Sequence, residues 1–120
     1  MVRLLNRRPT NVRRLGQKIS LDFDGEHLEN RIVYRRIPEV ANWDRHRDVV
    51  IVPRSVPRKL QVSLAVHESV EKYITEKYGY GYRYAHMVSE HIEERWAREH
   101  GIDIPSYQRT VVRLSRAYKR

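Results

Sequence analysis

Apolar and polar residues alternate along residues 19–23 (ISLDF), as they do in a strand with one buried face. The dipeptide Asp24-Gly25 that follows is typical of a type I′ hairpin turn, which needs positive φ at both positions. A return strand is expected over residues 28–37. The apolar run of residues 49–52 (VVIV), closed by Pro53, predicts a further short, buried strand.

A helical period replaces this alternation after Pro57. The first helix is expected to end at Gly79 and the second to run from about Arg83 to Gly101, because glycine is a common C-terminal stop. A third, amphipathic helix is expected over residues 105–120. The pattern therefore predicts an α+β fold, a small antiparallel sheet followed by three helices.

His67 and Glu71 occupy positions in the first helix where apolar residues are expected. They share one stripe, at steps of three and four, with Leu60, Leu64, Ile74 and Tyr78. A second apolar row contains Val62, Val66, Val70 and Tyr73, and Ser69, Lys72 and Glu76 are left for water. A helix that is apolar on two sides is expected to be buried. A carboxylate there costs several kcal/mol unless it is paired or binds a metal.

The second helix carries a similar pair, His86 and Glu90, again four residues apart. Two His/carboxylate pairs on consecutive helices are an arrangement from which proteins build metal sites. We expect at least three of the four side chains to converge on one point. The alternative is that the pairs hydrogen-bond each other and fix the packing of the helices.

These motifs resemble the core of the zincin metallopeptidases. The strand at residues 49–53 and the helix segment Leu64-Ala65-Val66-His67-Glu68 carry the resemblance, here in an HExxE rather than an HExxH form. In the gluzincin branch the third ligand is a Glu on the next helix. Eighteen residues separate Glu71 from Glu90, as in aminopeptidase-like members. The chain also resembles short uncharacterised archaeal and phage proteins in which an HExxE helix precedes an Ala-His helix, here Ala85-His86.

The resemblance implies a divalent metal held by His67, Glu71 and Glu90, with His86 as a further ligand. Glu68 would be the catalytic residue that holds a water. Zinc is the metal that the family implies, and manganese or iron also suits a donor set with more oxygen. The expected function is metal binding by a zincin-like protein, as a hydrolase of peptides or as an inactive relative. The strand before the helix would be the place where an extended peptide adds to the sheet.

Tyrosines alternate with other residues in the loop between the two helices, at Tyr78, Tyr80, Tyr82 and Tyr84. A hydroxyl beside a metal can stabilise an oxyanion, which makes Tyr80 and Tyr82 candidates. The alternative is that these rings cover the helix ends.

Charge suggests a different function. The 120 residues carry a net charge of +9, and the excess lies at the two ends. Basic ends on a neutral body are typical of DNA- or RNA-binding proteins. The candidate residues are Arg7, Arg8, Arg13, Arg14, Arg109, Arg113, Arg116 and Arg120. The alternative function is therefore a small nucleic-acid-binding protein in which the His/Glu pairs are structural.

The expected organisation is a basic arm over residues 1–17, a zincin-like domain over 18–104 and a basic helix over 105–120 packed on that domain. The absence of cysteine excludes disulfides, zinc fingers and cysteine nucleophiles. No apolar run is long enough for a membrane span or a secretory signal, so a cytoplasmic location is expected. Many Arg and Glu residues without Cys favour a thermophilic source.

Overall fold

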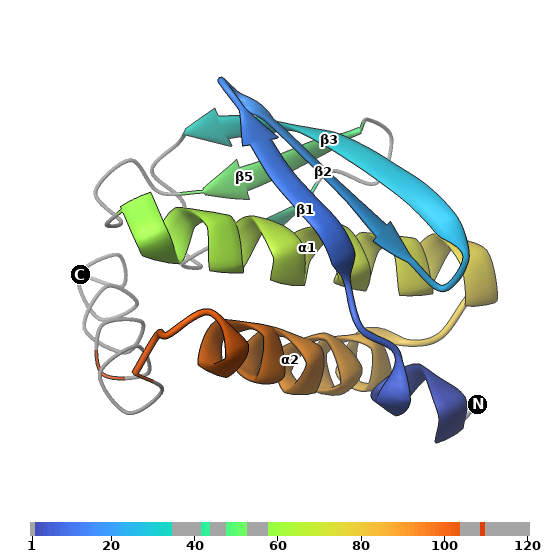
Figure 1. Ribbon diagram of the computed structural model, residues 1–120. Coiled ribbons are helices and arrows are strands. Elements are labelled where there is room, and N and C mark those ends of the chain that lie inside the picture. The colour runs from blue at the N-terminus through green and yellow to red at the C-terminus, as the bar shows by residue number, and fades with distance from the viewer. Residues whose placement is uncertain (1, 35–41, 44–47, 53–57, 104–108, 110–120) are drawn as a thin grey trace.

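The computed structural model describes residues 2–34, 42–43, 48–52, 58–103 and 109. The elements in chain order are a 3-10 helix η1 (Val2–Asn6), the strands β1 (Thr10–Leu15), β2 (Lys18–Phe23), β3 (Glu26–Tyr34), β4 (Asn42–Trp43) and β5 (Val49–Val52), and the helices α1 (Arg58–Tyr78) and α2 (Tyr82–Glu99). Figure 1 shows the sheet lying over α1, with α2 on the side of α1 away from the sheet.

The sheet is mixed, with the strand order β1-β2-β3-β5-β4. The pairs β1–β2, β2–β3 and β4–β5 are antiparallel, but β3 and β5 run parallel. The expectation of an antiparallel sheet is therefore wrong. The reason is that the expected loop contains a strand, β4, which occupies the sheet edge beyond β5. Strand β5 then lies between β3 and β4, antiparallel to β4 and therefore in the direction of β3.

The hairpin expected from the sequence is confirmed. Asp24 and Gly25 have φ values of 54° and 76°, as a type I′ turn requires. Ile19, Leu21 and Phe23 are buried and alternate with partly exposed residues, so their side of β2 faces the core.

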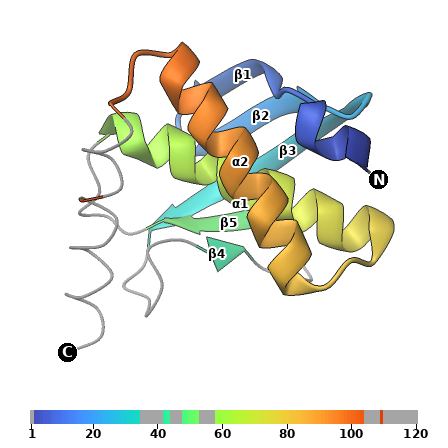
Figure 2. The same cartoon turned by 90° about the horizontal axis from the view of Figure 1, so that it is seen from below.

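Within the described residues two helices follow the sheet, and the expectation of three is wrong there. Of the third expected helix, residues 105–120, only Arg109 lies within the described residues. Seen from below, α2 crosses over α1 (Figure 2). Helix α1 is therefore the middle of three layers, which explains its two apolar rows and the burial of Val66, Val70 and Ile74.

The N-terminal residues expected to form an arm include β1, which pairs with β2 over Thr10–Leu15. None of the helices in the described part is both long and apolar enough to cross a membrane.

Candidate metal centre

The two sides of α1 are distinguished by their hydrogen bonds. On one side, Ser69 and Tyr73 reach the sheet, where Ser69 accepts a hydrogen bond from Asn30 and Tyr73 donates one to Asp24. On the other side, His67 and Glu71 reach α2. The polar side chains in the expected apolar stripe therefore lie in the interface between the two helices.

Glu71 is the centre of the cluster. It is 2% exposed, and its Oε2 atom lies 3.0 Å from His67 Nε2 and 2.9 Å from His86 Nδ1. One ligand atom from each of these three residues lies within 4.8 Å of the others, a group that could hold a metal ion. A tetrahedral zinc with bonds of about 2.0–2.1 Å separates neighbouring ligand atoms by about 3.3 Å, so small side-chain movements would admit the ion.

His67 is held from both sides. Its Nδ1 atom lies 2.7 Å from Glu93 Oε1 of α2, and Ser63 Oγ donates to the other oxygen of Glu93 at 3.4 Å. Burial alone would lower the pKa of His67, but the hydrogen bonds to Glu71 and Glu93 outweigh it and hold that pKa well above its ordinary value. Burial also raises the pKa of the Glu93 carboxyl, against the lowering effect of the hydrogen bond from His67.

In metal centres, the ring nitrogen of a histidine that does not bind the metal commonly donates to a carboxylate, which fixes the tautomer and the orientation of the ring. When the Nδ1–H group donates to Glu93, Nε2 is the nitrogen that points into the cluster. A metal and a proton would compete for that nitrogen, which couples metal uptake to proton release.

His86 forms the solvent side of the centre, since its side chain is 42% exposed. The ring of Tyr82 stacks on it at a centroid distance of 5.3 Å, and the ring of His67 lies edge-on at 4.9 Å. Tyr82 itself is 64% exposed. The centre is therefore buried on the α1 side and opens beside the first turn of α2.

Three of the four side chains expected to converge do so, namely His67, Glu71 and His86. Glu90 lies outside this group: its carboxylate is 55% exposed and sits 3.8 Å from Nε2 of His86, the nitrogen opposite the one that faces Glu71. Glu93 was not expected from the sequence as a partner of His67. The sequence feature that indicates burial of Glu93 is its position four residues after Ser89 and three before Trp96, on the inner face of α2.

The other candidates divide between the centre and its surroundings. Glu68 is buried at 6% exposure, and its charge contributes to the raised pKa of His67. Tyr80 stacks on Tyr78 at 5.4 Å and meets Tyr84 edge-on at 4.9 Å, so it belongs to an aromatic cluster at the helix ends.

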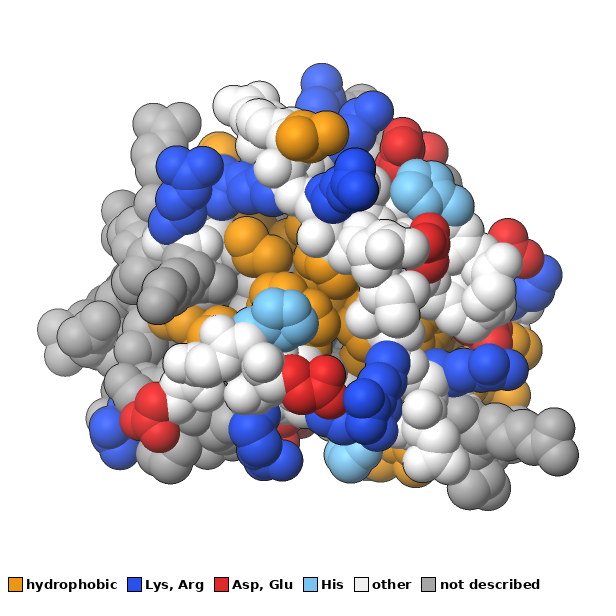
Figure 3. All heavy atoms as spheres, in the orientation of Figure 1, with side chains coloured by type: hydrophobic (Ala, Val, Ile, Leu, Met, Phe, Trp, Pro, Cys, Tyr) orange, Lys and Arg blue, Asp and Glu red, His pale blue; other side chains and the backbone are white. Residues whose placement is uncertain are grey.

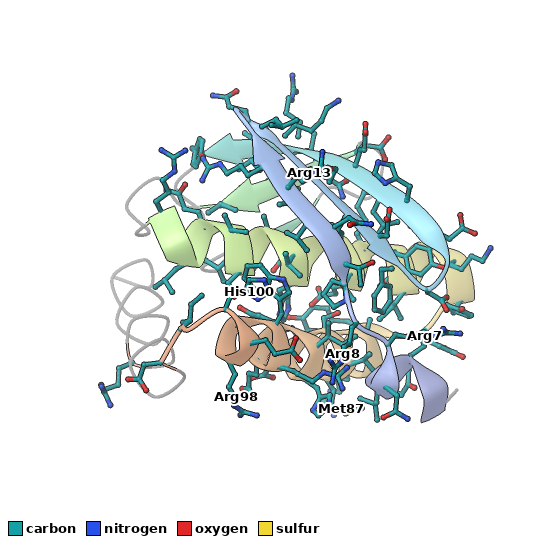
Figure 4. The ribbon with its side chains drawn as sticks, in the orientation of Figure 1. Arg7, Arg8, Arg13, Met87, Arg98 and His100 are labelled. Carbon is teal, nitrogen blue, oxygen red and sulfur yellow. The ribbon has the colours of Figure 1, made fainter. Side chains whose placement is uncertain are left out.

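Most of the described N-terminal arginines make intramolecular contacts. Arg7 pairs with Asp24 at 3.4 Å, Arg8 pairs with Glu99 at 3.5 Å, and Arg14 donates to Gln61 at 2.7 Å. Figure 4 shows Arg7 and Arg8 between η1 and β1, with Arg13 farther along β1. On the face shown in Figure 3, Lys and Arg side chains form separate groups around an apolar centre.

Arg13 and Arg109 are exposed, whereas Arg113, Arg116 and Arg120 lie outside the described residues. Nucleic-acid binding through the chain ends therefore stays a prediction.

Comparison with protein-family models, curated proteins and solved structures finds no match to this chain. The resemblance to zincins accordingly remains an expectation from the motifs.

One part of that expectation is wrong in the structure. Strand β5, expected to accept an extended peptide, is paired on both sides, with β3 and with β4, and so offers no free edge along Val50 and Ile51.

Proposed function

We propose that the protein binds a divalent metal ion, zinc in the first instance, through His67, Glu71 and His86, and that it is a metal-dependent hydrolase of peptides. The observation that carries the proposal is that a carboxylate contacts each of the two ring nitrogens of His67. Glu93 holds one ring nitrogen at 2.7 Å, and the other nitrogen faces Glu71 and His86. The contact with Glu93 fixes the orientation of the imidazole, as outer carboxylates do for metal-binding histidines.

The donor set fits a catalytic site. Two imidazole nitrogens and one carboxylate oxygen are ligands that zinc uses in hydrolases, and three protein ligands leave a fourth position open. A bound ion of this kind would lower the pKa of a coordinated water and polarise a substrate carbonyl. The partial exposure of His86 supplies a path from solvent to that position.

The protein groups around the centre have distinct roles in the proposal. Glu68 follows His67 on α1, rotated by about 100° around the helix, and would accept the proton of the attacking water at its carboxylate. Tyr82 lies at the rim, and its hydroxyl would donate to the developing oxyanion. Glu93 touches no substrate and acts by positioning His67.

A buried carboxylate in this interface also gives a reason for metal binding. Glu68, Glu71 and Glu93 are all less than 7% exposed, and Glu71 and Glu93 contact the same histidine from the two packed helices. Carboxylates brought together out of water repel each other, and a divalent cation removes that penalty.

The proposal is tested by titrating the metal-free, tag-free protein with Zn²⁺, Mn²⁺ and Fe²⁺ in a calorimeter. We expect one ion per chain, with Zn²⁺ bound most tightly, and a strong loss of affinity in Glu71→Ala. Absence of saturable binding by all three ions would contradict the metal site. Binding without cleavage of any peptide in a random library would retain the site and identify an inactive relative.

A further inference from the structure

Strand β3 has an edge that no described strand covers. Residues 26–31 pair with β2 on one side, but β5 joins the other side only from Arg31 onward. The amide of Arg31 donates to the carbonyl of Asp48 at 2.8 Å, so the backbone groups of Arg31 point toward the side of β3 on which β5 lies. Because backbone groups alternate in direction along a strand, those of His27 and Glu29 point to the same side as those of Arg31. Such an edge is a template for another extended chain.

A hollow of about 370 Å³ lies along this edge and against α1. The edge contributes residues 27–30, the start of β5 contributes Asp48, and α1 contributes Ser69, Lys72, Tyr73 and Glu76. The expectation that Ser69 and Lys72 face water is wrong, since they are 1% and 5% exposed. They form part of the wall of this hollow.

The charges in the lining favour a cation. Three carboxylates, on Glu29, Asp48 and Glu76, stand against one lysine and His27, whose ring lies 3.2 Å from Glu29. The ammonium group of that lysine, Lys72, already donates to Glu76. Asp48, which also lines the hollow, is exposed.

Asn30 supplies a second, independent indication of a ligand. It is 5% exposed, and its Nδ2 atom donates to Ser69 Oγ at 3.0 Å. Its Oδ1 atom is buried and has no hydrogen-bond partner among the described residues. A buried amide oxygen without a donor is uncommon in folded proteins and calls for an explanation. A donor group entering the hollow would satisfy it.

We propose that this hollow binds an arginine side chain presented by an extended peptide segment, whose backbone pairs with the free edge of β3 beside His27 and Glu29. The guanidinium group carries five donors and no acceptor, which suits Asp48 and the Oδ1 atom of Asn30. Strand addition contributes affinity through main-chain hydrogen bonds, and the pocket contributes the side-chain preference.

This site is separate from the metal centre. Ser69 and Tyr73 lie on the sheet side of α1, whereas His67 and Glu71 face α2. The proposal therefore does not depend on metal binding.

Fluorescence anisotropy with the full chain tests it. The probe is a labelled nine-residue peptide of alternating Thr and Val with one central arginine, and the matched peptide carries citrulline there. We expect the arginine peptide to bind at least tenfold more tightly than the citrulline peptide. Asp48→Asn should weaken the arginine peptide five- to tenfold, and Glu99→Gln, a carboxylate on α2, should leave it unchanged. Both variants are checked for unaltered thermal melting.

Further experiments separate the backbone pairing with β3 from the binding of the arginine side chain. N-methylation of the peptide on the amides that would face β3 should weaken binding at least tenfold, and a chelator should have no effect. Equal binding of the arginine and citrulline peptides, or insensitivity to Asp48→Asn, would overturn the proposal. So would equal affinity for arginine methyl ester, which cannot form a strand, or loss of binding on chelation, which would place the peptide at the metal centre.

Discussion

Glu93 Oε1 lies 2.7 Å from Nδ1 of His67, across the interface between α2 and α1. Both side chains are buried, at 4% and 6% exposure. This contact directs the other nitrogen of His67 toward Glu71, and it links the orientation of a candidate ligand to the packing of the two helices. The local HExxE motif alone would leave that orientation undetermined.

The contact predicts a specific effect of Glu93→Gln. Glutamine keeps the shape of the side chain but removes the charge that fixes the His67 tautomer. We expect the affinity for Zn²⁺ to fall by roughly 10- to 100-fold, the range found for such outer partners. Competition with a chromophoric chelator measures this change. Unchanged affinity in a folded Glu93→Gln variant would show that Glu93 does not orient a metal ligand.

Glu90 and Glu71 provide a matched pair of variants. The exposed Glu90 contacts the far nitrogen of His86, whereas Glu71 lies between both histidines. We therefore expect Glu90→Gln to change Zn²⁺ affinity by less than about fivefold, well below the effect of replacing a ligand or its fixed outer partner. Glu71→Gln should nearly abolish binding. The reverse order of effects would assign the third ligand to Glu90, as the gluzincin spacing implies.

Glu68→Gln is expected to separate metal binding from chemistry. The substitution keeps a polar side chain next to His67 but removes the proton acceptor. Metal content and melting temperature should stay close to those of the unaltered protein, while cleavage of a peptide library, followed by mass spectrometry, should fall by about 10²- to 10⁴-fold. Retained cleavage would remove Glu68 from its proposed role.

Asp24 predicts a dependence of stability on pH. Burial raises the pKa of its carboxyl, but hydrogen bonds from Tyr78 and Tyr73 and the charge of Arg7 lower it more, so the folded pKa lies below the ordinary 3.8. A lowered pKa adds stability above pH 3.8 and loses that contribution as the pH falls through the folded pKa.

Asp24→Asn is the test, because asparagine tolerates the positive φ of this turn. Near neutral pH the variant should be less stable by roughly 1.5–3 kcal/mol, the usual size for a hydrogen bond to a charged group. In urea unfolding, the difference between the two proteins should shrink between pH 5 and pH 3. A difference that is independent of pH would contradict the assigned role of the Asp24 charge.

The elements that were predicted are those specified by local patterns. Strand β5 matches its expected residues, and α1 and α2 begin and end within a few residues of the expected positions. In each case the period of apolar residues and a nearby glycine or proline define the element. The β2–β3 turn was equally local, since Asp24-Gly25 favours one turn type.

The failures arise from contacts between distant parts of the chain. Strand β1 carries polar and basic residues and contains no fully buried side chain, so its sequence lacks the usual alternation. Strand β4 has two residues, too few to produce a pattern. The parallel pairing of β3 and β5 depends on where β4 lies in the sheet, which no local signal specifies.

The same limit applies to the candidate site. The i,i+4 rule correctly grouped His67 with Glu71, because both lie on one helix. It also correctly paired His86 with Glu90, which lie 3.8 Å apart, but the rotation of α2 against α1 brings Glu93, and not Glu90, onto His67. That rotation depends on packing across the interface, including Ile92 and Trp96 on α2, and spacing within one helix cannot provide it.

The most direct test of the metal centre is the thermal melting of the tag-free protein with and without a chelator, together with its metal content. If Zn²⁺ is bound through His67, Glu71 and His86, saturation at a thousand times the dissociation constant adds about 4 kcal/mol to the free energy of unfolding. The chelated protein should therefore melt roughly 10 °C or more lower, and Zn²⁺ should restore the loss in the unaltered protein but not in Glu71→Ala. Identical melting with and without chelator, in a protein that carries no metal and takes up none, would contradict the metal centre and leave the His/Glu cluster as a structural network.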